Sequence, residues 1–137
     1  MENLEFIRGQ FTEAELETAI IDLFREQGYD YVDGETIHRS FEEVLLKEDL
    51  RGYLRSKYRD LTDLEVERAI SRLDNVPSAP LYQGNREAFL LVNEGFDLVR
   101  DEHGKLAVHI DFIDFESPGN NTFKVVNQFS VQGERLR

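Results

Sequence analysis

Two kinds of hydrophobic spacing divide the chain. Up to about residue 80, apolar residues recur three and four positions apart, the spacing of helices that bury one face. After residue 80 they tend to alternate with polar residues, which indicates half-buried strands. The sequence therefore predicts an α+β fold in which a mostly helical half, residues 1–80, packs on a mixed or antiparallel sheet from a mostly strand half, residues 81–137.

Three helix starts are predicted by one local pattern, a Ser or Thr followed three residues later by Glu, which forms a capping box. The pattern begins at Thr12, Ser40 and Thr62. Gly28 is a typical C-cap for the first helix, which is expected to run to about residue 27. The proline-containing segment 75–80 ends the third helix.

Extended segments are predicted by period-two alternation and by short apolar runs. They cover residues 29–32, 89–92, 95–100, 105–115 and 122–132. Residues 101–104, Asp-Glu-His-Gly, are a good turn between two of them and predict a hairpin. Along the second arm of this hairpin one face is apolar, formed by Leu106, Val108, Ile110 and Phe112.

The last predicted strand, residues 122–132, has one polar residue on its apolar face. Asn127 stands between Val125 and Phe129 on that face. A buried amide must find hydrogen-bond partners or costs about 1–3 kcal/mol. Asn127 is therefore expected either to brace the sheet or to form the floor of an active site.

Length and composition limit the function classes. A chain of 137 residues with 40% hydrophobic residues predicts a single domain over residues 1–137 with a real core. The net charge of −12 argues against non-specific DNA binding by this chain alone, because phosphate contacts need a basic surface. The absence of cysteine excludes disulfides, cysteine-based zinc sites and a cysteine nucleophile. Neither a signal peptide nor a membrane-spanning window is recognisable, which favours the cytoplasm.

Two groups of polar residues are candidates for metal binding. One acidic group could hold Mg²⁺ through Asp111, Asp114 and Glu116. A solvated strand edge and its following loop is the interpretation we favour, because strands routinely carry polar residues on one face. The histidines lack metal-ligand spacing, and two of them are expected at the surface, namely His103 and His109.

Two carboxylates flank the buried face of the first helix. At 100° per residue, Glu13 falls near the apolar stripe and Glu17 on its edge. Spacing alone favours an ordinary role, in which Glu13 satisfies the helix N-terminus and Glu17 lies at the surface. The same positions would also suit a site beside the helix.

Several segments, taken in order, resemble the N-terminal part of the restriction (R, motor) subunit of type I restriction-modification enzymes. The match is most specific where Ile113-Asp114-Phe115 is followed by Asn120-Asn121-Thr122-Phe123-Lys124-Val125-Val126-Asn127-Gln128-Phe129. The other similar segments are residues 11–21, 26–31, 37–40, 43–46 and 85–87. Their order and spacing cover nearly the whole chain.

The resemblance implies a PD-(D/E)xK nuclease fold, of which this chain would be an incomplete part. In that family helicase-like domains use ATP to pump DNA, and the nuclease cuts the DNA with Mg²⁺. The subunits for specificity and methylation are separate chains. The resemblance thus implies a type I site-specific deoxyribonuclease as the parent protein.

In the family, a strand like residues 122–132 is followed by a Pro-Asp pair and then a Glu-x-Lys strand, which supply metal ligands and a lysine. Neither motif occurs between residue 132 and Arg137. The main catalytic residues are therefore expected beyond Arg137, and this fragment is expected to be inactive by itself. What remains here is a first-helix carboxylate, for which Glu17 and Glu13 are the candidates.

Two other functions remain open at this point. The chain could be a non-catalytic interaction or regulatory module with a nuclease-like fold, or part of a different PD-(D/E)xK nuclease used in repair or recombination. An interrupted sheet would expose backbone groups at its edge, and such edges pair with other copies. We therefore also expect self-association through the terminal strand.

Overall fold

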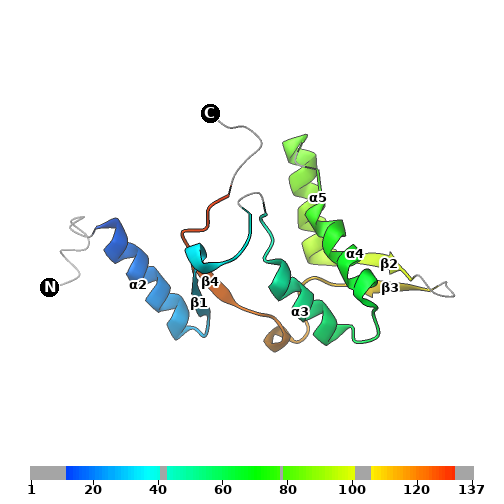
Figure 1. The fold of residues 1–137 in the computed structure, drawn as a ribbon, viewed down its shortest axis with the longest axis horizontal. Coiled ribbons are helices and arrows are strands. Elements are labelled where there is room, and N and C mark those ends of the chain that lie inside the picture. The colour runs from blue at the N-terminus through cyan, green and yellow to red at the C-terminus, as the bar shows by residue number, and fades with distance from the viewer. Residues whose placement is uncertain (1–11, 41–42, 78, 101–105, 132–137) are drawn as a thin grey trace. The chain divides into compact units, whose positions relative to one another are not determined.

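The computed structural model describes residues 12–40, 43–77, 79–100 and 106–131. These residues form four α-helices and two small sheets, one parallel and one antiparallel (Figure 1). The predicted α+β class is therefore confirmed. The chain divides into two compact units, Met1–Val44 with Phe123–Arg137, and Leu45–Thr122. Each unit is described by itself, and the single domain over residues 1–137 stays a prediction.

The first unit begins with helix α2, Glu13–Glu26, as predicted. The Thr12 hydroxyl caps it by accepting from the backbone N–H of Glu15 at 3.1 Å. The helix ends at Gln27, and Gly28 follows with a φ of +95°, a conformation that favours glycine.

A parallel two-stranded sheet completes the first unit. Strand β1, Asp30–Asp33, pairs with strand β4, Lys124–Asn127, and helix α2 packs against both strands. The short helix η1, Gly34–Thr36, follows β1. The predicted strand over residues 122–132 is too long, because Gln128 has a φ of +52° and leaves the extended conformation.

The second unit packs three helices and a hairpin around one core. Its elements are α3 Lys47–Lys57, α4 Asp63–Asp74, α5 Leu81–Glu94, β2 Phe96–Val99, β3 Ala107–Ile110 and η2 Pro118–Asn120. Its buried apolar side chains are Leu54, Val66, Ala69, Ile70, Leu91, Leu98, Ile110 and Phe112. This core includes residues from all three helices and both strands.

The predicted hairpin is confirmed, since β2 and β3 pair antiparallel with Phe96 opposite Ile110. Its turn, residues 101–104, lies outside the described residues. The face predicted to be apolar is buried at Ile110 and Phe112 and partly buried at Val108. Leu106, on the same predicted face, is instead 81% exposed.

Two predicted elements are wrong. No helix begins at Ser40: residues 43–46 are not helical, and α3 begins at Lys47 without a side-chain cap. The carbonyls of Ser40 and Glu43 accept from Arg39 instead. The strand predicted over residues 89–92 lies inside helix α5. Leu91 is buried there while Phe89 is 65% exposed, so this apolar run is amphipathic at helical spacing.

Candidate functional site

The two parallel strands of the first unit end side by side. Asp33 is in register with Asn127, and each is the last residue of its strand. Ligands of open α/β sheets bind beyond the carboxyl ends of parallel strands. The carboxyl ends of β1 and β4 are therefore the candidate site, and helix α2 packs against both strands.

Gly34 makes the closest approach at these strand ends. A Cβ atom built on Gly34 would lie 2.2 Å from the carbonyl oxygen of Asn127 and 2.7 Å from that of Gln128. The turn is fixed by Asp33, whose carboxylate accepts from the backbone N–H of Glu35 at 2.9 Å. Only glycine allows β1 to turn so close to the end of β4.

Asn127 finds its hydrogen-bond partner across the sheet. The Tyr31 hydroxyl donates to Oδ1 of Asn127 at 3.0 Å. Tyr31 is in register with Val125, so the two polar side chains are diagonal neighbours on one face. Of the two interpretations of Asn127, this contact supports the one in which the amide braces the sheet.

Glu17 reaches the strand end, and Glu13 does not. The Gln128 side-chain amide donates to Oε1 of Glu17 at 3.0 Å, and Glu17 is partly buried. Glu13 is exposed in the first turn of α2. The structure therefore brings one of the two predicted carboxylates to the carboxyl ends of the strands.

Arg39 holds the segment that follows β4. Its guanidinium lies over the Phe129 ring, 3.7 Å from the ring centroid, and donates to the carbonyl oxygen of Ser130. The same group donates to the carbonyls of Ser40 at 3.0 Å and Glu43 at 2.7 Å. No sequence pattern indicates this role of Arg39, because its partners at residues 129 and 130 are remote in the chain.

Magnesium fits this site only in part. Mg²⁺ is bound through oxygen ligands, commonly one or two carboxylates with water. Within residues 12–40, 43–77, 79–100 and 106–131, no three His, Cys, Asp or Glu side chains gather to hold a metal ion. Glu17 can supply one oxygen ligand, and the Asp33 carboxylate already accepts from the backbone of Glu35.

The acidic group considered for Mg²⁺ does not come together either. Glu116 is exposed, as a solvated loop residue would be, whereas Asp114 is buried in the second unit. Asp114 accepts from the Asn120 amide at 3.0 Å and from the backbone N–H of Ser117 at 2.8 Å, and it pairs with Lys57 at 3.4 Å. These contacts lower the pKa of Asp114, the Asn120 amide most.

Asn121 closes the same loop. It accepts from the backbone N–H of Asp114 at 2.9 Å, and its amide donates back to the carbonyl of Asp114 at 2.9 Å. The solvated-edge interpretation is therefore wrong for Asp114. This carboxylate holds the loop over residues 114–121, because its oxygens are occupied by the loop itself.

His109 lies at the surface, as predicted, but its ring is held on both sides. Nδ1 is 2.8 Å from Oδ1 of Asp97, and Nε2 is 2.8 Å from the carbonyl oxygen of Glu94 and 3.3 Å from Oδ1 of Asp111. The Asp97 carboxylate is the main cause that raises the pKa of His109, and partial burial opposes it. His38 is exposed, and His103 lies outside the described residues.

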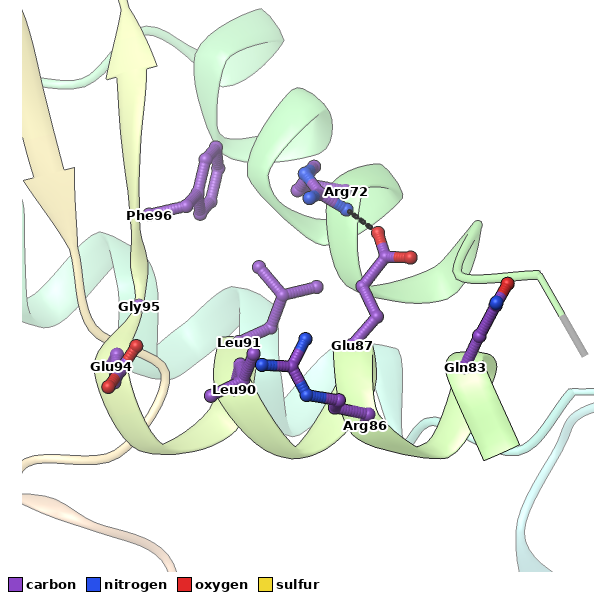
Figure 2. Close-up of a pocket in the computed structure, with 9 residues that line it drawn as sticks. All are labelled: Arg72, Gln83, Arg86, Glu87, Leu90, Leu91, Glu94, Gly95 and Phe96. Atoms are coloured by element: carbon purple, nitrogen blue, oxygen red, sulfur yellow. Dashed lines mark hydrogen bonds and ion pairs between the residues drawn. The ribbon is translucent and has the colours of Figure 1, made fainter. Parts of the chain in front are cut away.

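A groove of about 450 Å³ lies in the second unit between α4, α5 and β2 (Figure 2). Leu90, Leu91 and Phe96 give it apolar walls. Arg72 donates to Glu87 across it at 3.0 Å, as Figure 2 shows. With Arg86 and Glu94 on the wall as well, cations and carboxylates are balanced, and no catalytic set of side chains is apparent.

Comparison with known proteins identifies one family. The family described as type I restriction enzyme R protein N terminus matches residues 10–137. No curated protein and no solved structure matches the chain. Within the described residues, no helix is long and apolar enough to cross a membrane.

Proposed function

Since the chain belongs to the family of type I restriction enzyme R protein N termini, we propose that it forms the N-terminal part of the endonuclease domain of an R subunit. The fold we propose for that domain is of the PD-(D/E)xK type. The supporting observation is the contact of Glu17 with Gln128, because it puts a first-helix carboxylate at the carboxyl ends of β1 and β4. The family match favours this over a repair or recombination nuclease.

In this proposal Glu17 is an oxygen ligand of the site, directly or through water. Glu17 would help to hold Mg²⁺ there, and the bound ion would supply positive charge for the attacking and leaving oxygens of phosphodiester hydrolysis. Gln128 orients the Glu17 carboxylate, and Asn127 with Tyr31 keeps the end of β4 in register. The remaining ligands and a catalytic lysine come from residues other than those described, since no three His, Cys, Asp or Glu side chains gather to hold a metal ion among the described ones.

Other parts of the enzyme complete the activity. The net charge of −12 means that DNA affinity comes mainly from elsewhere in the R subunit and its complex. ATP acts at helicase-like domains, and separate subunits provide specificity and methylation. The location we propose for the complex is the cytoplasm.

The test uses the full-length R subunit in its complex, with Mg²⁺, ATP and a plasmid substrate. Glu17→Gln is expected to lower the rate of DNA cleavage by about 10–100-fold, because it removes a charged oxygen ligand. ATP hydrolysis is expected to stay unchanged. Glu13→Gln is the matched control in the same helix, and it is expected to cleave at the wild-type rate.

Wild-type cleavage by the Glu17→Gln complex would contradict the proposed role of Glu17. The 137-residue chain by itself is expected to leave supercoiled plasmid intact with Mg²⁺. Metal-dependent nicking by the pure chain would contradict the proposal that it carries only part of the site.

A second candidate function is a non-catalytic interaction or regulatory module. The lack of a metal-binding group among the described residues favours it. In that case Glu17→Gln and Glu13→Gln would both leave cleavage unchanged, whereas deletion of the chain would weaken assembly of the complex. Assembly is measured by co-purification of the specificity and methylation subunits.

A further inference from the structure

The end of β4 has a backbone conformation that needs support. Gln128 has a φ of +52°, in the left-handed region that residues with a Cβ atom avoid. It is the only described residue other than glycine with a positive φ. Because glutamine has no intrinsic preference for this region, its surroundings must hold it there.

The left-handed turn has a direct consequence for the candidate site. It ends the strand at Asn127, and the Gln128 amide donates to Glu17 at 3.0 Å from this position. If β4 continued in an extended conformation, the side chain of residue 128 would point to the face of the sheet opposite that of Asn127, because side chains alternate along a strand. The contact with Glu17 therefore depends on the turn being kept.

Arg39 is the side chain that holds the chain just after the turn. Its guanidinium stacks on Phe129 and donates to the carbonyl of Ser130. The other side of the same group is anchored on the carbonyls of Ser40 and Glu43. The planar fork of arginine can stack and donate in several directions at once, which the ammonium group of lysine cannot do.

On the opposite side, the backbone of Gly34 packs against the carbonyls of Asn127 and Gln128. Gly34 thus contacts the backbone at Asn127 and Gln128, and Arg39 contacts the next two residues, so the turn is held from both sides. Arg39 itself touches neither Glu17 nor any metal ligand that we propose.

We propose that Arg39 is a positioning residue of the nuclease site: by holding Phe129 and Ser130 it keeps Gln128 in the left-handed turn, and Gln128 in turn holds the Glu17 carboxylate. This inference rests on the proposed function. It adds a chain of contacts from Arg39 through Gln128 to Glu17, and it predicts that a change at Arg39 acts on the site through Gln128.

The first test is made on the 137-residue chain by NMR. In the wild type, the side-chain amide protons of Gln128 are expected to show nuclear Overhauser contacts to Glu17. Arg39→Lys keeps the positive charge, but it is expected to lose these contacts, and the side-chain amide shifts of Gln128 are expected to move to those of a glutamine without a protein hydrogen-bond partner. Arg25→Lys is the matched control, since Arg25 lies near the Tyr31 ring at 5.9 Å rather than on the turn.

If Arg39→Lys does not fold, Phe129→Leu replaces it, because this variant removes only the stacked ring and keeps the hydrogen bonds of Arg39. It is expected to weaken the same Gln128–Glu17 contacts in a folded chain. Contacts unchanged from the wild type, in either folded variant, would overturn the inference.

The second test uses the full R subunit in its complex. Arg39→Lys is expected to raise the Mg²⁺ concentration for half-maximal cleavage at least several-fold, with ATP hydrolysis unchanged. Added to Glu17→Gln it is expected to cause little further loss, because both act on one contact. A purely structural role would lower ATP hydrolysis and cleavage together at an unchanged Mg²⁺ requirement, and that result would overturn the inference.

The two proposals can fail separately. If Glu17→Gln leaves cleavage unchanged, the role of Glu17 in the proposed function is wrong, whatever the NMR result. If Glu17→Gln lowers cleavage but Arg39→Lys changes neither the NMR contacts nor the Mg²⁺ requirement, the proposed function stands and the role of Arg39 is wrong.

Discussion

At the scale of single residues, the candidate site depends on Gly34, which has no side chain. Gly34 lets β1 turn within contact distance of the two carbonyls that end β4. The residues around it are ordinary in type, and their importance comes from the spacing that this glycine allows.

Gly34→Ala is expected to destabilise the chain by about 1–3 kcal/mol, because the new methyl group overlaps backbone atoms that cannot rotate away. A Cβ atom built on Gly52, inside helix α3, would meet nothing within 4 Å. Gly52→Ala is expected to stabilise the chain by about 0.5–1 kcal/mol through helix propensity. Urea denaturation measures both, and equal effects of the two variants would contradict the prediction.

His109 is expected to make the free energy of unfolding depend on pH. The folded chain raises the pKa of His109 above its ordinary value of 6.5, so the folded state holds a proton that the unfolded state releases. Its stabilising contribution is complete below pH 6.5 and is lost as the pH rises through the folded-state pKa. His109→Gln is expected to remove this slope from the free energy of unfolding.

Urea unfolding at a series of pH values over the neutral range measures this slope for the wild type and for His109→Gln. The same slope in His109→Gln and the wild type would show that Asp97 does not hold the proton on His109.

At the scale of elements, a threonine side chain caps the start of α2 and of α4, whereas α3 and α5 begin without a side-chain cap. Helix α4 has a complete capping box, in which the Thr62 hydroxyl accepts from the N–H of Glu65 at 3.1 Å and the Glu65 carboxylate accepts from the N–H of Thr62 at 2.9 Å. Glu65 is also the buried partner of Arg100, at 2.8 Å. One carboxylate thus fixes the start of α4 and the residue after strand β2.

Thr62→Ala is expected to lower the free energy of unfolding by about 1 kcal/mol, because it removes an N-cap hydrogen bond. Ser40→Ala is the matched control: Ser40 shows the same local sequence pattern but caps no helix. The control is expected to be neutral. Thermal unfolding followed by circular dichroism compares the two, and a loss at Ser40 equal to that at Thr62 would contradict the structure.

These two positions also show how far the sequence could predict the elements. The Ser/Thr-x-x-Glu pattern is local, and it was right at Thr12 and Thr62, where an amphipathic stretch follows directly. At Ser40 the pattern was wrong. No helix begins there, and the carbonyl oxygens of residues 40 and 43 accept hydrogen bonds from Arg39. Residues 89–92 were misassigned because a short apolar run suits a buried strand and a helix equally.

The candidate site could be predicted only in part. Helical spacing placed Glu17 and Glu13 near one face, but the choice between them needed Gln128, which is remote in sequence. The partner of Asn127 is Tyr31, and no local pattern indicates a hydrogen bond over such a separation. Arg39 lies in the similar segment 37–40, but no pattern indicated its role, because its partners are backbone carbonyls and one aromatic ring.

At the scale of the whole molecule, the sheet of the first unit is incomplete among the described residues. Strands β1 and β4 pair with each other, and no other described strand joins the edges of this sheet. Such edges pair with further strands, and the net charge of −12 opposes association only where it is not screened.

The chain is therefore expected to self-associate through the strand β4 edge as protein concentration and salt rise. Static light scattering gives the average mass over a concentration series at low and high salt. A constant monomer mass at high concentration in high salt would contradict this prediction.

The order in which the chain is synthesised determines when β1 and β4 can pair. The two strands, Asp30–Asp33 and Lys124–Asn127, are far apart in the sequence, and the whole second unit, Leu45–Thr122, is made between them. Strand β1 cannot pair with β4 until residue 127 has left the ribosome, and by then all of Leu45–Thr122 has been made. Prior folding of that inserted unit would shorten the free loop that β4 must close, so the carboxyl ends of β1 and β4 are expected to meet after the second unit has folded.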